Sequence, residues 1–139
     1  MVRIEDEGVF DAPVDRIWKY MNDQGNHRHG TIREMKPVDK KGNVTTFEST
    51  LIGPDKKTFK EKWRMTFNPP KGFETEVLEG PSKGSKFAHV YTPQGSKTHV
   101  KVSGDWKMGN LDDATTKKNV LAYLDTVFKE DNAALKTYK

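Results

Sequence analysis

The segment from Phe10 to Met21, FDAPVDRIWKYM, marks the end of a first strand and the start of a short amphipathic helix. Asp11 is the candidate N-cap, Pro13 suits a first turn in which its missing N–H needs no partner, and Asp15 complements the helix dipole. The apolar side chains recur at the spacing of one buried helix face, and they are Val14, Ile17, Trp18 and Met21. A strand over residues 2–10 followed at once by this helix strongly constrains the fold.

Six strand-like runs follow the helix, and each is closed by a turn signal rich in glycine, proline, asparagine or aspartate. They cover residues 31–38, 44–52, 57–67, 73–78, 85–92 and 97–107. This pattern is typical of an antiparallel meander.

From Asp112 onward the apolar residues recur with a helical period, in a stripe made of Val120, Leu121, Leu124, Val127, Phe128 and Leu135. Roughly 25 residues at ~1.5 Å each give a helix about 40 Å long, which only a broad curved sheet could cover. The sequence therefore predicts an α+β domain over residues 1–139, with about seven strands curved around a long C-terminal helix and one or two short helices after the first strand. The space between sheet and helix is the natural binding site.

The composition excludes several classes of protein. The chain has no cysteine, so no disulfide or thiolate metal site is expected, and its aromatic content is too high for a disordered chain. No apolar stretch approaches the roughly 20 residues that span a bilayer, and the first residues lack the apolar core of a signal peptide. We expect a cytoplasmic protein without integral membrane association. The net charge of +4 is spread along the chain, so nucleic acid is not an expected partner.

Three segments resemble the START-like, Bet v 1-like superfamily, also called the SRPBCC or polyketide cyclase/lipid transport group. They are FDAPVDRIWKYM (10–21), GSKFAHVYTPQGSKTHVKVSGDW (84–106) and the C-terminal NAALKTYK (132–139). The resemblance covers nearly the whole chain by the order of its elements, and it implies a helix-grip fold. Members of the group carry sterols, lipids, plant hormones or polyketides, while others are cyclases, ring hydroxylase subunits or chaperone co-activators.

Strand alternation predicts which side chains face the helix. The inward set contains Phe59, Glu61, Trp63, Met65 and Phe67 on residues 57–67, then Phe73, Thr75 and Val77, then Phe87, His89 and Tyr91, and finally Val100, Val102 and Trp106. With Leu124 and Phe128 of the helix, we predict a ligand-binding set of Phe59, Glu61, Trp63, His89, Tyr91, Val102, Leu124 and Phe128.

Glu61 and His89 are the ionisable side chains on this apolar face. In a simple meander one strand separates their own strands, which predicts a distance of about 9–10 Å between them. Each is either satisfied by a neighbouring hydrogen-bond partner or water, or is one of the few polar groups that orient a mostly apolar ligand. Acid–base catalysis by the pair is a further alternative, which would make the protein a cyclase or dehydratase. Asp131 likewise lies either at the open end of the helix seam or against a ligand head group.

Three other patterns predict structure more than chemistry. The sequence Gly80-Pro-Ser-Lys-Gly84 matches a nucleophile elbow, but strands on both sides indicate a turn. His27 and His29 are spaced i, i+2, which does not converge on one helix face, so we expect no metal; by the family resemblance they belong to an entrance loop. Lys60, Lys62 and Arg64 form a basic outer stripe.

The prediction for function is binding or transport of a small hydrophobic or amphipathic molecule, with no cofactor. The alternatives are the cyclase or dehydratase that uses Glu61 and His89, and a chaperone-regulator-like interaction module that uses the outer stripe. The sequence leaves the ligand and the oligomeric state open.

Overall fold

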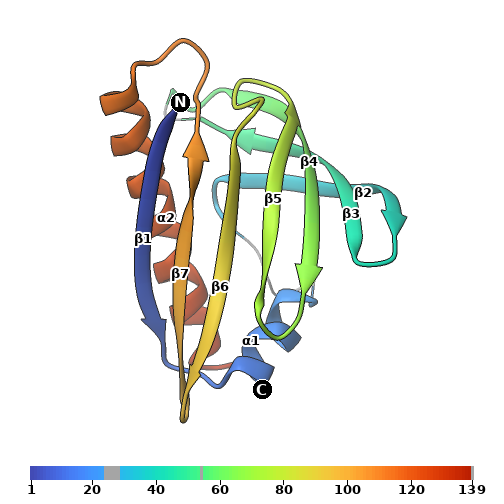
Figure 1. Ribbon diagram of the computed structural model, residues 1–139, viewed down its shortest axis with the longest axis vertical. Coiled ribbons are helices and arrows are strands. Elements are labelled where there is room, and N and C mark those ends of the chain that lie inside the picture. The colour runs from blue at the N-terminus through green and yellow to red at the C-terminus, as the bar shows by residue number, and fades with distance from the viewer. Residues whose placement is uncertain (24–28, 54, 139) are drawn as a thin grey trace.

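The computed structural model describes residues 1–23, 29–53 and 55–138, and it has the predicted order of strand, short helix, six strands and long helix. The elements are β1 (Val2–Phe10), α1 (Val14–Met21), β2 (Ile32–Lys41), β3 (Val44–Ile52), β4 (Thr58–Asn68), β5 (Gly72–Glu79), β6 (Lys86–Gln94), β7 (Lys97–Trp106) and α2 (Asp113–Leu135). Within the described residues the strands form one antiparallel sheet in the order β1-β7-β6-β5-β4-β3-β2 (Figure 1). The α+β helix-grip prediction is confirmed.

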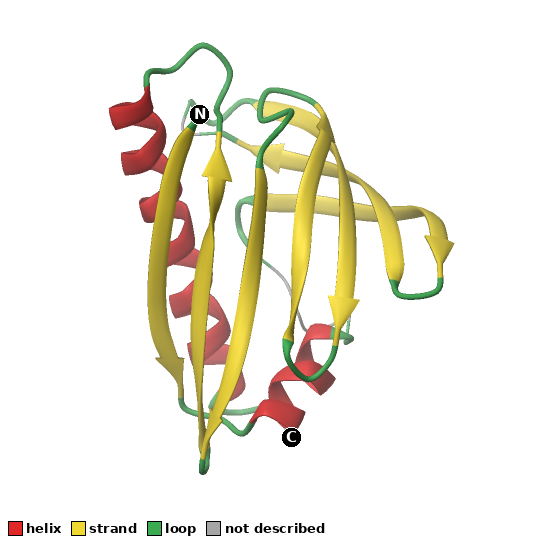
Figure 2. Ribbon diagram, viewed as in Figure 1, coloured by secondary structure: helices red, strands yellow, loops and turns green. Residues whose placement is uncertain are grey.

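The sheet is strongly curved. Figure 2 shows β2 and the adjoining part of β3 crossing at a steep angle to β1, β7 and β6. The β2–β3 pair has register shifts between Ile32 and Glu34 and between Pro37 and Asp39, and the β4–β5 pair has one between Lys62 and Trp63. Such irregularities bend a strand and increase its twist, which is how the meander turns around the helix.

The start of α1 differs from the sequence prediction. Pro13, not Asp11, is the N-cap: its backbone is extended, and its carbonyl accepts from the N–H groups of Arg16 (3.1 Å) and Ile17 (3.2 Å). Asp11 lies too early to cap, and its N–H is held by Asn132 Oδ1 at 3.2 Å. The Trp18 indole donates to the carbonyl of Pro70 at 3.0 Å, which fixes α1 under the β4–β5 turn.

The long helix α2 begins with an N-cap from Asp112, whose carboxylate accepts from the N–H of Thr115 at 2.7 Å. Its 23 residues span about 35 Å, slightly less than predicted. The helix packs against β1, β7 and α1, and in Figure 1 it lies behind β1 and β7. The buried core is therefore on this side of the sheet and includes Ile4, Phe10, Val100, Val102, Trp106, Val120 and Leu124.

Gly104 of β7 is a point of close backbone approach. It pairs with Phe87, and a Cβ at this position would lie 2.3 Å from the carbonyl oxygen of Lys86 and 2.4 Å from the Phe87 Cα. Both atoms belong to the backbone of β6, so they cannot move aside without distorting the sheet.

We therefore expect Gly104→Ala to lower the free energy of unfolding by about 3 kcal/mol or more, measured by urea denaturation. The neighbouring Ser103→Ala, on the other face of β7, serves as the control and should change it by less than about 0.5 kcal/mol. Equal stability of the two variants would contradict this account of the β6–β7 contact.

Candidate functional site

The inward side chains of β3 to β6 form a continuous surface that we call the inner wall. The registers place them on one face, since Trp63 lies between Phe47 and Val77, and Thr75 lies between Met65 and Phe87. The inner wall consists of Thr45, Phe47, Ser49, Leu51, Phe59, Glu61, Trp63, Met65, Phe67, Phe73, Thr75, Val77, Phe87, His89 and Tyr91. The predicted inward faces of β4, β5 and β6 are thus confirmed.

The inner wall is less tightly covered than the core. Most of its aromatic side chains are half-buried, as is Tyr123 of α2. Burial nevertheless raises the pKa of Tyr123 well above its usual range, and burial lowers the pKa of His89. These side chains therefore keep part of their surface accessible although protein surrounds them.

His89 is the most distinctive polar group on the inner wall. Its ring stacks on Phe73, with centroids 4.4 Å apart and planes at 11°, and Phe87 lies on another side at 6.0 Å. Burial among these rings lowers the pKa of His89 to about 4, against a smaller opposing effect of Asp131. The imidazole is therefore neutral at pH 7, and its Nδ1 has no hydrogen-bond partner.

Two hydroxyls of the inner wall share this lack of a partner. Ser49 Oγ and Thr75 Oγ1 are buried without a hydrogen bond, as is Thr31 Oγ1 at the start of β2. An unsatisfied buried polar group costs about 1–3 kcal/mol. Thr75 pairs with Phe87 and His89 with Phe73, so the two side chains are diagonal neighbours about 7–8 Å apart.

Glu61 lies at the other end of the inner wall and is already satisfied. One carboxylate oxygen accepts from the Trp63 indole at 3.0 Å and the other from the N–H of Ser82 at 2.8 Å. These bonds stabilise the charge of a side chain in a residue that is only 7% exposed.

The expected distance of 9–10 Å between Glu61 and His89 is wrong. His89 pairs with Phe73, whereas Glu61 packs against Gly80, where a Cβ would lie 2.7 Å from its Cγ. The chain from position 73 to position 80 covers on the order of 20 Å at about 3.3 Å per residue. An acid and a base must both reach the reacting atoms, so this pair cannot act on one bond.

A second acidic group borders the site at the His89 end. The Asp131 carboxylate accepts from the Tyr20 hydroxyl at 3.2 Å. His29 contacts both acids of α2, with Nδ1 at 3.0 Å from Glu130 Oε1 and Nε2 at 3.5 Å from Asp131 Oδ1. His29 is thus attached to the C-terminal half of α2, while His27 lies outside the described residues. The contacts with Tyr20 and His29 explain why an acidic residue, Asp131, lies on the apolar seam of α2.

Sequence reasoning did not select Tyr20 or Tyr123. Tyr123 lies four residues before Val127 and eight before Asp131, so the helical period itself could have identified it. Of the predicted ligand-binding residues, Tyr91, Val102 and Leu124 are buried in the core, and Phe128 packs on Phe10 with centroids 4.8 Å apart. Phe59, Glu61, Trp63, His89 and Tyr91 belong to the inner wall.

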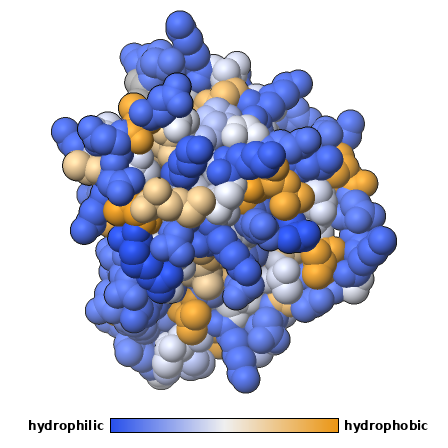
Figure 3. All heavy atoms as spheres, turned by 45° about the horizontal axis from the view of Figure 1, so that its top comes forward, coloured by the Kyte–Doolittle hydropathy of each residue, from blue (hydrophilic) through white to orange (hydrophobic). Residues whose placement is uncertain are grey.

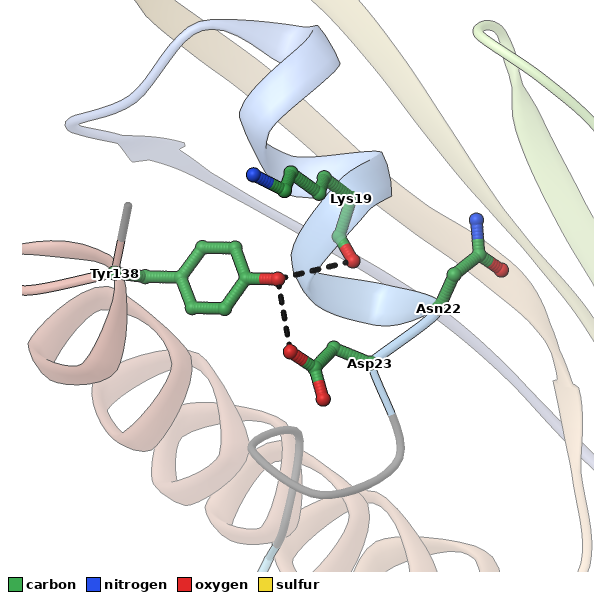
Figure 4. Close-up of a pocket in the computed structure, with 4 residues that line it drawn as sticks. All are labelled: Lys19, Asn22, Asp23 and Tyr138. Atoms are coloured by element: carbon green, nitrogen blue, oxygen red, sulfur yellow. Dashed lines mark hydrogen bonds between the residues drawn. The ribbon is translucent and has the colours of Figure 1, made fainter.

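A separate hollow of about 680 Å³ lies open on the surface beside the end of α1, and it is lined by Lys19, Asn22, Asp23 and Tyr138 (Figure 4). The Tyr138 hydroxyl bridges the carbonyl of Lys19 at 3.4 Å and Asp23 Oδ2 at 3.0 Å. These contacts attach the C-terminal end of the chain to α1.

The remaining motifs have structural roles. Residues 80–84 form the turn between β5 and β6, as predicted. The described residues contain no group of three side chains placed to hold a metal ion. Neither described helix is long and apolar enough to cross a membrane. Lys62 and Arg64 of the outer stripe pair with Glu79 and Glu76 of β5.

No family model matches the chain, and no curated protein matches its sequence. Solved structures, in contrast, match its fold over almost its whole length. A START superfamily protein from Mycobacterium smegmatis superposes with a TM-score of 0.82 at 12% identity, covering 99% of both chains. The structure of Ara h 8.0201 gives a TM-score of 0.77 at 14% identity over 98% of both chains.

A third similar structure is the ZhuI aromatase/cyclase from Streptomyces sp. R1128. It gives a TM-score of 0.74 at 11% identity, covering 96% of this chain and 90% of the other. Identities this low carry information on the fold alone. With its curved seven-stranded sheet and long C-terminal helix, the described chain has the helix-grip fold of START-like and Bet v 1-like proteins.

Proposed function

We propose that the protein binds a small amphipathic molecule in the space between the inner wall and α2. The observation that carries the proposal is the set of neutral polar atoms without partners on this otherwise aromatic surface, namely Ser49 Oγ, Thr75 Oγ1 and His89 Nδ1. A few polar groups on a mainly apolar wall are typical of a small-molecule site, where they orient the ligand. Each of these atoms has almost no accessible surface in the free protein, so a ligand would supply the missing hydrogen bonds together with a local shift of the surrounding side chains.

The interaction module receives less support. It would use Lys60, Lys62 and Arg64 on the outer face of β4, but the last two already face acidic side chains of β5. An exposed stripe that is partly neutralised in this way attracts an acidic partner weakly. The inner wall is the better candidate.

Ligand binding can be measured with N-phenyl-1-naphthylamine, an uncharged dye that fluoresces in apolar surroundings. We expect saturable binding, and we expect Met65→Trp, which fills the centre of the inner wall, to weaken it at least fivefold. Thr66→Trp adds the same side chain to the outer face of β4 and should change the affinity less than twofold. Equal effects of the two variants, or binding that does not saturate, would argue against the proposal; Met65→Phe provides a milder variant should Met65→Trp not fold.

Two buried threonines provide a test of whether the unpaired hydroxyls lower the stability of the free protein. Thr75 has no partner, whereas Thr98 Oγ1 donates to the carbonyl of Ala12 at 2.8 Å. We expect Thr75→Val to raise the free energy of unfolding by about 1 kcal/mol and Thr98→Val to lower it by about 1–3 kcal/mol, both from urea denaturation. A loss of stability in Thr75→Val would mean that this hydroxyl has a partner in the free protein.

The neutral state of His89 can be measured by NMR titration of its imidazole nitrogens, with the His89→Phe variant to assign the signals. We expect a midpoint near pH 4. Because an unfolded histidine titrates near pH 6.5, the contribution of neutral His89 to stability is complete above that pH and is lost as the pH falls towards 4.

Within that window the stability of the wild type should fall by about 1.4 kcal/mol per pH unit relative to His89→Phe. A midpoint near 6.5 would show instead that the His89 ring is fully hydrated or paired.

A further inference from the structure

The basic side chains of the described chain lie on the surface, whereas two of its acidic side chains lie in the interior. In the described part of the chain every lysine and arginine is exposed except Lys62, which points outward to Glu79. The face in Figure 3 is accordingly mainly hydrophilic, with separate small hydrophobic patches. The inner wall therefore receives no lysine or arginine from the described residues.

The acids are distributed differently. Glu61 is buried on the inner wall, and Asp131 is half-buried on the α2 side at the His89 end. Burial is the main cause of the shifted pKa values around the space, and the charge of Asp131 adds to it by raising the pKa of Tyr91 and Tyr123 and by opposing the lowered pKa of His89. Glu61, at the other end of the inner wall, also raises the pKa of Tyr123, by a smaller effect than Asp131.

The three polar atoms of the inner wall that lack a partner are uncharged. Two are hydroxyls, Ser49 Oγ and Thr75 Oγ1, and the third belongs to the His89 imidazole. Neutral groups of this kind exchange hydrogen bonds with a hydroxyl, carbonyl or amine, but they cannot neutralise an anion. In surroundings of low dielectric constant, an anionic ligand would meet these neutral groups and two carboxylates, and its own charge would not be compensated.

We propose that the inner wall and α2 select ligands by charge, and that they accept an uncharged or cationic amphipathic molecule while excluding carboxylates, sulfates and phosphates. This inference rests on the proposed function, since it concerns the ligand of the same space. It is opposite to what the net charge of +4 would suggest for the surface. The selection works by repulsion of the wrong ligand, because no lysine or arginine of the described chain lies on the inner wall, whereas Glu61 and Asp131 border the site.

The test uses two ions with the same ten-carbon chain, decylammonium and decanoate, as competitors of bound N-phenyl-1-naphthylamine at pH 8. Both are fully charged at this pH and both lose hydration on entry, so their ratio reports the sign of the potential inside. We expect decylammonium to displace the dye at a concentration at least tenfold lower than decanoate, and decan-1-ol to displace it at least as well as decylammonium.

Variants of single acidic residues show which carboxylates cause the preference for decylammonium over decanoate. Asp131→Asn should reduce the ratio between the two ions at least threefold, whereas Asp125→Asn should leave it unchanged, because Asp125 is exposed on the same helix and pairs with Lys129 at 3.0 Å. Glu61→Gln is a second interior variant should Asp131→Asn not fold. Decanoate competing as well as decylammonium, or an unchanged ratio in both interior variants, would overturn charge selection and leave ligand binding intact. Failure of the wild type to bind the dye at all would instead remove the proposed function.

Discussion

The contact of α2 with β1 is the constraint on which the rest of the structure depends. Gly8 of β1 has no side chain, and the Phe128 ring of α2 packs directly on it. A Cβ at position 8 would lie only 2.8 Å from the Cε2 atom of Phe128. Phe128 also packs on Phe10, so the helix is held against the edge strand. A single helix about 10 Å wide that is fixed over β1 and β7 cannot also cover β3 to β6. The inward side chains of those strands therefore form a wall that meets the core only at Tyr91 and at the neighbouring Phe67, Phe73 and Phe87.

The position of α2 over β1 and β7 also bears on which buried hydroxyls have a hydrogen-bond partner. Thr98 and Thr75 are both buried threonines on the inner face of the sheet. Thr98 lies where the chain enters α1, and its hydroxyl donates to a backbone carbonyl there. Thr75 lies in the middle of the inner wall, and its hydroxyl has no partner. Valine would fill either position without a hydroxyl and with a good strand preference. The described contacts give the Thr75 hydroxyl no role in the fold, which is why it supports the proposed ligand site.

The sequence predicted the faces of the strands well and their relative register poorly. Side chains alternate with a fixed period of two, so Phe59, Glu61 and Trp63 had to share a face whatever lay beside them. The position of Glu61 along the sheet depends instead on the β5–β6 turn and on the irregularity at Lys62, whose effects on pairing leave no periodic signal. The cap of α1 failed for a local reason, because the fixed backbone of Pro13 starts the helix two residues after Asp11.

The net charge, like the other composition values, describes the surface of the protein and not its interior. A net charge of +4 is a property of the outer surface, where the lysines and arginines of the described chain are solvated. Asp131 and Glu61 contribute little to that sum, yet they are the charges nearest to the proposed site, where a low dielectric constant would strengthen their effect. On the proposed charge selection, a molecule that approaches the protein meets a surface of net positive charge, and a molecule that enters would meet the two carboxylates. The two fields act on different steps, since the outer one influences encounter and the inner one determines which ligand stays bound.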